Sequence, residues 1–223
     1  MTKENIIQLK HKFKKLGRNG LDEIEMLKLL LSYSTPRKNT DKLAHELIKQ
    51  YETLRKILNQ SIEELSEFIG EEAAIIIKFA KAFIIQYFEP YTGEKIILSS
   101  PENVSEYLEK YLQAEIGDCE REKFMVLCLN SSNELIYKEV LFRGTIDQAQ
   151  VYPREILKLA IIKNASAIIL IHNHPSGNSK PSEDDLILTK RIESISKEVG
   201  VRVHDHLIVA SPGSVYSIKA NRH

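Results

Sequence analysis

The fold of the second half of the chain is decided by Ala167-Ile-Ile-Leu-Ile-His-Asn-His174 and the residues that follow it, Pro-Ser-Gly-Asn-Ser-Lys-Pro-Ser-Glu-Asp-Asp185. Residues 167–171 are a short apolar run, which is typical of a strand buried within a sheet. Gly177 and Pro181 favour a turn after this strand. Because Ser182 is followed directly by acidic residues, we expect a helix to begin there. The stretch therefore predicts a strand–turn–helix unit.

On either side of this unit, strand-like and helix-like patterns alternate. We expect further strands at 123–129, 135–142 and 201–210, and helices that begin at Ser100 or span 153–164 and 183–199. Residues before 90 show helical spacing, with expected helices at 21–33, after a Thr40 cap, after a Ser61–Glu64 capping box, and at 72–88. Pro90 and Gly93 mark a linker at 89–94. The sequence predicts an α/β protein, with a helical domain over 1–90 and, over 96–223, an α/β domain whose sheet is sandwiched by helices.

Composition excludes several classes of protein. The 223 residues have a formal net charge of zero, so no global field attracts nucleic acid or an anionic membrane. Residues 1–20 are locally basic, which favours a solubilising tail over a nucleic-acid-binding arm; the basic residues are Lys3, Lys10, Lys12, Lys14, Lys15 and Arg18. The two cysteines, the lack of a signal-peptide pattern and the lack of a membrane-length apolar run indicate a soluble, cytoplasmic protein.

Three residues of the strand–turn–helix unit have the chemistry of a metal site. Residues two apart on a strand point to the same side, so His172 and His174 can converge on one ion. Asp185, in the first turn of the next helix, can add a carboxylate oxygen. Two imidazoles and one carboxylate leave the fourth position of Zn²⁺ to water, as in catalytic zinc sites. Taken singly, Ser182 and Asp185 are explained by a helix start and His172 by a core hydrogen bond, but the joint pattern arises by chance only about once in a thousand such chains.

At these positions the sequence resembles a known family. The pattern His-x-His-x7-Ser-x2-Asp matches the JAMM motif of the MPN-plus zinc metalloproteases. The strings His172-Asn-His-Pro-Ser-Gly177, Leu141-Phe-Arg-Gly-Thr-Ile-Asp147, Pro153-Arg-Glu155 and Asp205-His206 are similar to the RadC-like bacterial branch of that family. The resemblance is strong over 96–218 and weaker over the N-terminal helices.

The resemblance implies a role for each matching residue. His172, His174 and Asp185 would hold zinc, and Ser182 would donate a hydrogen bond to the developing oxyanion. The family's general base is a glutamate at the start of the first long strand of the domain. Glu122 is the best match, but spacing alone does not select it over Glu120 or Glu139. The cluster His204-Asp205-His206 is interpreted as a strand-end pair, with a hydrogen-bond partner for a zinc histidine as the alternative.

For the N-terminal helices the resemblance implies a degenerate helix-hairpin-helix unit. Its turn would contain Gly70, but Glu71 and Glu72 follow where a phosphate would approach, so we expect no DNA binding through this hairpin. The predicted function is a zinc-dependent metallopeptidase or isopeptidase that acts on a peptide or protein and is not bound to a membrane. The alternatives are a DNA-associated repair accessory protein without peptidase activity and a catalytically silent scaffold. The substrate and the oligomeric state stay open.

Overall fold

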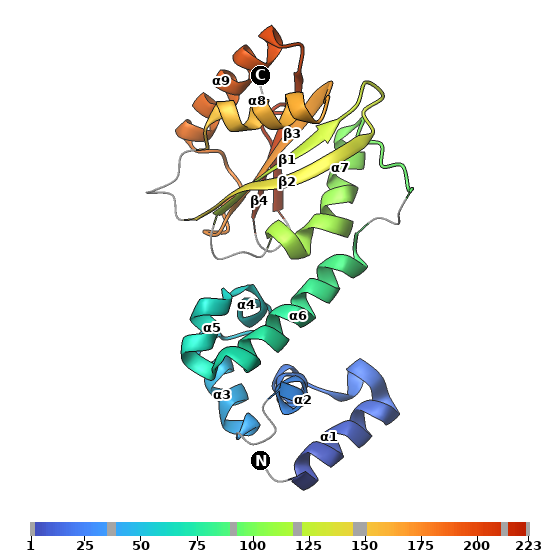
Figure 1. Ribbon diagram of the computed structural model, residues 1–223, viewed down its shortest axis with the longest axis vertical. Coiled ribbons are helices and arrows are strands. Elements are labelled where there is room, and N and C mark those ends of the chain that lie inside the picture. The colour runs from blue at the N-terminus through green and yellow to red at the C-terminus, as the bar shows by residue number, and fades with distance from the viewer. Residues whose placement is uncertain are drawn as a thin grey trace. The chain divides into compact units, whose positions relative to one another are not determined.

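The computed structural model describes residues 3–34, 39–89, 93–117, 122–144, 151–210 and 214–221. The chain divides into two compact units, Met1–Tyr87 and Phe88–His223. The described part of the first unit is helical, and the second contains a five-stranded sheet with helices (Figure 1). The predicted α/β fold class, with a helical region ahead of a sheet, is confirmed. Residues 90–92 of the expected linker lie outside the described residues.

The first unit is a set of short helices around one apolar core. Its elements are α1 (Lys3–Leu16), η1 (Gly17–Gly20), α2 (Glu23–Ser34), α3 (Thr40–Tyr51), α4 (Leu54–Asn59), α5 (Ile62–Ile69) and α6 (Glu71–Tyr87). Helices α2 to α6 each contribute buried aliphatic side chains, among them Leu27, Leu31, Leu47, Ile57, Leu65 and Ile77. Full burial of one such side chain contributes roughly 1.5–3 kcal/mol, so this shared core stabilises helices too short to be stable alone.

Two helix starts in this unit test the predicted caps. The Ser61 hydroxyl accepts from the Glu64 N–H and the Glu64 carboxylate accepts from the Ser61 N–H, so the predicted capping box is confirmed. Thr40 was expected to cap α3, and this is wrong: Asn39 is the cap, accepting from the Lys42 N–H. Thr40 is instead the first helical residue and is buried.

The basic N-terminal stretch is also different from its sequence interpretation. Its described residues form α1 and η1 rather than a tail. The Lys12 ammonium pairs with the Glu25 carboxylate of α2 at 2.6 Å, and the Lys10 ammonium lies 4.7 Å from the centre of the Tyr33 ring. These contacts attach the helix to its neighbour.

The sheet of the second unit has the strand order β2-β1-β3-β4-β5. The strands are β1 (Glu122–Leu129), β2 (Leu135–Gly144), β3 (Ala167–His174), β4 (Arg202–Ala210) and β5 (Ser214–Ser217). Strand β1 is antiparallel to β2 and β3, whereas β3 and β4 are parallel. Parallel neighbours need a crossover, and α9 (Glu183–Glu198) supplies it. The crossover places the start of α9 just after the carboxyl end of β3.

Helices cover both faces of this sheet (Figure 1). One face packs against α7 (Pro101–Tyr107) and η2 (Leu108–Gly117), and the other against α8 (Pro153–Ile162) and α9. Strand side chains alternate between the faces: Met125 and Leu127 face η2, whereas Val126 and Cys128 face α8. This is the α/β/α layering that the sequence predicts.

The sheet differs from the sequence prediction most clearly at the end of β3 and in one additional strand. Strand β3 continues past Ile171 to His174, because its backbone pairs with β4 as far as the His174–Ala210 register position. Strand β5, pairing antiparallel with β4, was not predicted. Among the described residues, no helix is both long enough and apolar enough to cross a membrane.

Candidate metal centre

The two histidines lie at the carboxyl end of β3. They continue the face that carries Ile168 and Leu170, which is the face covered by α8 and α9. Extended geometry persists through this segment, so both rings project toward α9. The Nε2 atoms of His172 and His174 are 3.0 Å apart. The sequence prediction that these two side chains converge therefore agrees with the structure.

Asp185 reaches the same point from the first turn of α9. Its Oδ1 lies 3.1 Å from His172 Nε2, and its Oδ2 lies 3.4 Å from His174 Nε2. One ligand atom from each residue can be chosen so that all three lie within 4.8 Å of one another. Ligand atoms about 2.1 Å from a tetrahedral zinc ion are about 3.4 Å apart, so the closest contacts between these three residues have the spacing that one such ion needs.

The turn between strand and helix sets this geometry. Gly177 has a φ of +81°, a left-handed conformation that favours glycine, and its N–H donates to the His174 carbonyl at 3.1 Å. His174 Nδ1 lies 2.8 Å from the Asn178 carbonyl oxygen. Because a carbonyl only accepts, His174 carries its proton on Nδ1 and presents the lone pair of Nε2 to the site.

The charges of the cluster reinforce one another. In its protonated form His174 can donate to Asp185, and this hydrogen bond is the main factor that raises the pKa of His174, against the effect of burial. Burial alone would raise the pKa of Asp185, but the adjacent His172 and His174 rings hold that pKa well below its usual range. Asp185 is therefore ionised at neutral pH, as a metal ligand must be.

Ser182 is the N-cap of α9, and its hydroxyl is engaged with Asp185. The hydroxyl oxygen accepts from the Asp185 N–H at 3.1 Å, and the hydroxyl O–H donates to Asp185 Oδ2 at 2.6 Å. The helix-cap interpretation of the sequence is thus confirmed, and it coexists with the cluster. Since the single hydroxyl proton is donated to Asp185, donation to an oxyanion would require the hydroxyl to rotate.

The three candidate bases have different surroundings. Glu122 is the half-buried first residue of β1, and burial raises the pKa of its carboxyl while His172 and His174 oppose the rise. Glu139 is paired with Val126 in the middle of β2, two strands away from β3. Glu120 lies outside the described residues. The pKa of Glu122 therefore responds to the charges of His172, His174 and Asp185.

Asn173, between the two histidines, is a site residue that sequence analysis did not single out. Its side chain points to the opposite side of β3 and is 1% exposed. Its Oδ1 accepts from the Lys123 N–H at 2.7 Å, one residue beyond the last β1–β3 pair, Phe124 with His172. This bond continues the strand pairing through a side chain and so holds Glu122 beside the end of β3. The alternation of side chains along a strand was the available signal.

His206 and Thr189 complete the surroundings of His172. His206 Nε2 is 2.8 Å from His172 Nδ1, and both Thr189 and His206 are fully buried. The Asp205 carboxylate instead accepts from the Ser217 hydroxyl. The sequence had favoured a strand-end pair for His206. The structure instead favours the alternative, in which His206 is a hydrogen-bond partner of His172.

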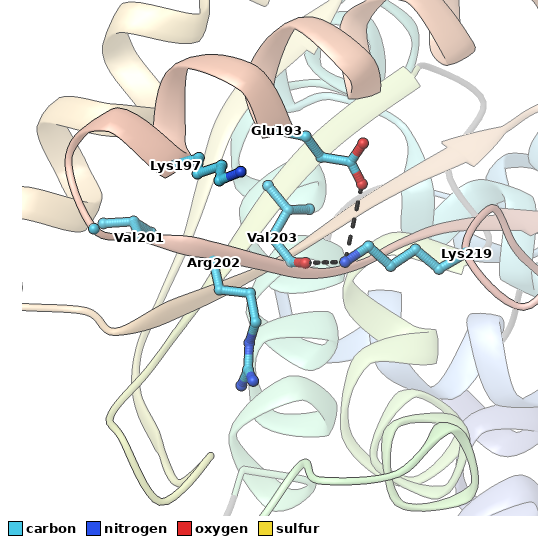
Figure 2. Close-up of a pocket in the computed structure, with 7 residues that line it drawn as sticks. Glu193, Lys197, Val201, Arg202, Val203 and Lys219 are labelled. Carbon is cyan, nitrogen blue, oxygen red and sulfur yellow. Dashed lines mark hydrogen bonds and ion pairs between the residues drawn. The ribbon is translucent and has the colours of Figure 1, made fainter.

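A separate pocket lies where α9 ends and β4 begins (Figure 2). Lys197, Arg202 and Lys219 lie along it, and the Lys219 ammonium is bonded to the Val203 carbonyl and lies 3.9 Å from the Glu193 carboxylate. This pocket is at the opposite end of α9 from Asp185, so it is distinct from the histidine cluster.

The layered domain and its cluster define the class of protein: an α/β/α domain with a His-His-Asp group, able to hold a metal ion, at the end of a central strand. The family comparison agrees, because residues 98–223 match the family model described as RadC-like JAB domain. The chain belongs to this RadC-like family, which confirms the resemblance seen in the sequence. At the level of the family, membership supports a JAMM-like hydrolase.

Relatives match nearly the whole chain. A UPF0758 protein of Aliivibrio fischeri is 40% identical over 199 residues, which are 87% of this chain and 86% of the relative. A UPF0758 protein of Fusobacterium nucleatum is 38% identical over 207 residues, 91% of this chain and 89% of the relative. One from Alteromonas mediterranea is 35% identical over 206 residues, 92% and 91% of the two chains. The name UPF0758 states no activity.

Proposed function

We propose that the protein is a zinc-dependent hydrolase that cleaves an amide bond, as a metallopeptidase or isopeptidase. The observation that carries the proposal is the open donor set of His172, His174 and Asp185. The closest donor atoms of each pair of residues are 3.0–3.4 Å apart, with Asp185 presenting Oδ1 to His172 and Oδ2 to His174. Structural zinc sites use four protein ligands, whereas hydrolytic sites use three and leave one position to water. RadC-like family membership supports the same choice.

In the proposed mechanism, zinc supplies a Lewis acid when bound and lowers the pKa of a coordinated water to about 7. The residues of the chain do the rest. Glu122 takes the proton of the attacking water on its carboxylate and returns it to the nitrogen of the departing amine. Burial raises the pKa of Glu122, which suits a group that must both accept and release a proton near neutral pH. Ser182 is proposed as the oxyanion donor after its hydroxyl rotates away from Asp185.

The proposal is tested first by metal content. Elemental analysis should find about one zinc per chain in the purified protein, and at least about ten-fold less after Asp185→Ala or His174→Ala. His45→Ala is the matched control, because His45 lies exposed on α3 and should leave the zinc content unchanged. Full zinc retention in Asp185→Ala would exclude the assigned ligands.

The proposal is tested next by cleavage. A peptide library treated with the protein should acquire new amino termini, and a chelator should abolish them until zinc is restored. Zinc binding without any amide cleavage would instead favour the catalytically silent scaffold. The substrate of the proposed reaction is a peptide or protein.

The alternative of a DNA-associated accessory protein rests on the basic helix α1. Glu71 and Glu72 occupy the first turn of α6 directly after Gly70, where phosphate binding at a helix N-terminus would take place. Any DNA binding should therefore come from the lysines of α1 and should weaken steeply as salt is raised.

A further inference from the structure

A relay of hydrogen bonds runs from His172 through the core to α9. His172 Nδ1 lies 2.8 Å from His206 Nε2 on β4, and His206 Nδ1 lies 2.6 Å from the Thr189 hydroxyl oxygen. The Thr189 hydroxyl in turn donates to the backbone carbonyl of Asp185 at 2.5 Å. This hydrogen-bond relay therefore begins at His172 and ends on the backbone of Asp185, and both residues belong to the proposed metal site.

The direction of every hydrogen bond in this relay follows from the last bond, between the Thr189 hydroxyl and the Asp185 carbonyl. A carbonyl oxygen can only accept, so the one hydroxyl proton of Thr189 points to Asp185. The hydroxyl oxygen must then accept from His206 Nδ1–H. In a neutral imidazole one nitrogen donates and the other accepts, so His206 Nε2 accepts from Nδ1–H of His172.

The consequence is a fixed tautomer of His172. With its proton on Nδ1, this ring directs the lone pair of Nε2 toward His174 and Asp185. If every hydrogen bond ran in the opposite direction, the Thr189 hydroxyl oxygen and the Asp185 carbonyl oxygen would lie 2.5 Å apart without a proton between them. This reversal would also place a proton on His172 Nε2, where a metal ion has to bind.

The surrounding packing protects this arrangement. Thr189 and His206 are 0% exposed and His172 is 5% exposed, so water does not compete for the bonds. The Phe124 ring stacks parallel to His172, with centroids 6.0 Å apart, and meets His206 edge-on at 5.6 Å. His174 needs no such relay, because its Nδ1 donates directly to the Asn178 carbonyl.

We propose that Thr189 and His206 are positioning residues, which set the tautomer and ring orientation of His172 before a metal ion arrives. The relay also couples β3 to the start of α9, so that His172 and Asp185 are held as one unit. This inference rests on the proposed metal site, and it concerns how that site is preorganised rather than which residues bind the ion.

The test uses pairs of matched variants. Thr189→Val keeps the shape of the side chain and removes the hydroxyl, whereas Thr189→Ser keeps the hydroxyl. His206→Gln keeps one acceptor and one donor, whereas His206→Leu has neither. Histidine tautomers are measured in metal-free protein by two-bond ¹H–¹⁵N NMR, zinc affinity by competition with a chelator, and folding by thermal midpoint.

We expect the metal-free wild-type protein and Thr189→Ser to show His172 protonated on Nδ1. Thr189→Val should populate both tautomers and bind zinc about ten-fold more weakly, the size typical of changes behind a metal ligand. His206→Gln should bind zinc more tightly than His206→Leu. If Thr189→Val does not fold, this second pair of variants tests the inference.

Three results would overturn the inference: His172 protonated on Nε2 in the metal-free wild-type protein, an unchanged tautomer in folded Thr189→Val, or Thr189→Ser binding as weakly as Thr189→Val. Failure of the proposed function is recognised separately, because wild-type protein would then either not bind zinc or bind zinc without cleaving amide bonds. The tautomer measurement still tests the relay in that case.

Discussion

Replacing Ser182 by alanine separates the two tasks that the structure gives to this residue. As the N-cap of α9, its hydroxyl oxygen accepts from the Asp185 N–H, and loss of such a cap costs about 1 kcal/mol. For a protein of this size that loss lowers the thermal midpoint by roughly 2–4 °C. If the hydroxyl also serves as the oxyanion donor, turnover should fall by about 10²–10³-fold.

The assay compares thermal midpoint, zinc content and turnover in the same Ser182→Ala preparation. We expect a small fall in midpoint, retained zinc, and a loss of turnover far larger than the loss of stability explains. Zinc should be retained because Asp185 keeps both histidine partners. A variant with the lower midpoint but wild-type turnover would show that Ser182 is a helix cap alone, and the oxyanion assignment would be refuted.

Three further predictions follow from other contacts. Asn173→Ala should retain zinc but lower turnover at least about ten-fold, because β1 loses the bond that holds Glu122 near the cluster; equal turnover would exclude this role. In metal-free protein the pKa of His174 is raised, so the protonated form of His174 stabilises the fold. Calorimetry should therefore show the free energy of unfolding falling as pH rises from about 6.5 through the raised pKa, and zinc-loaded protein should not show this fall. In DNA titrations, substitutions in 69–72 should have no effect, and salt-resistant binding abolished by them would contradict the account.

Local sequence patterns predicted the parts of the fold that depend on local physics. The apolar run 167–171 identified the central strand, and the Ser61–Glu64 and Ser182–Asp185 spacings marked helix starts that the structure confirms. Side-chain alternation also predicted that His172 and His174 project to one side. Side-chain alternation follows from the two-residue period of a strand, and helix capping follows from the unsatisfied N–H groups of the first turn. Both depend only on residues that are close together in the sequence.

Tertiary contacts account for what the sequence did not predict. Helix α1 is attached by Lys12 to Glu25 and by Lys10 to Tyr33, and residues this far apart leave no periodic signal. The partnership of His206 with His172 spans 34 residues of sequence. It depends on the β3–β4 register, in which an irregularity between Ile168 and Ile169 changes which β4 side chains face α9.

The most direct test of the central claim is cleavage of a peptide library by wild-type protein and by Glu122→Gln, with zinc content measured in both. The glutamine side chain cannot accept a proton at neutral pH, and general-base contributions are typically about 10²–10⁴-fold. The account predicts about one zinc per chain in both proteins, zinc-dependent cleavage by the wild type, and a loss of that size in the variant. Equal cleavage by the zinc-loaded variant would contradict the role of Glu122, and no cleavage by the zinc-loaded wild type would contradict the hydrolase itself.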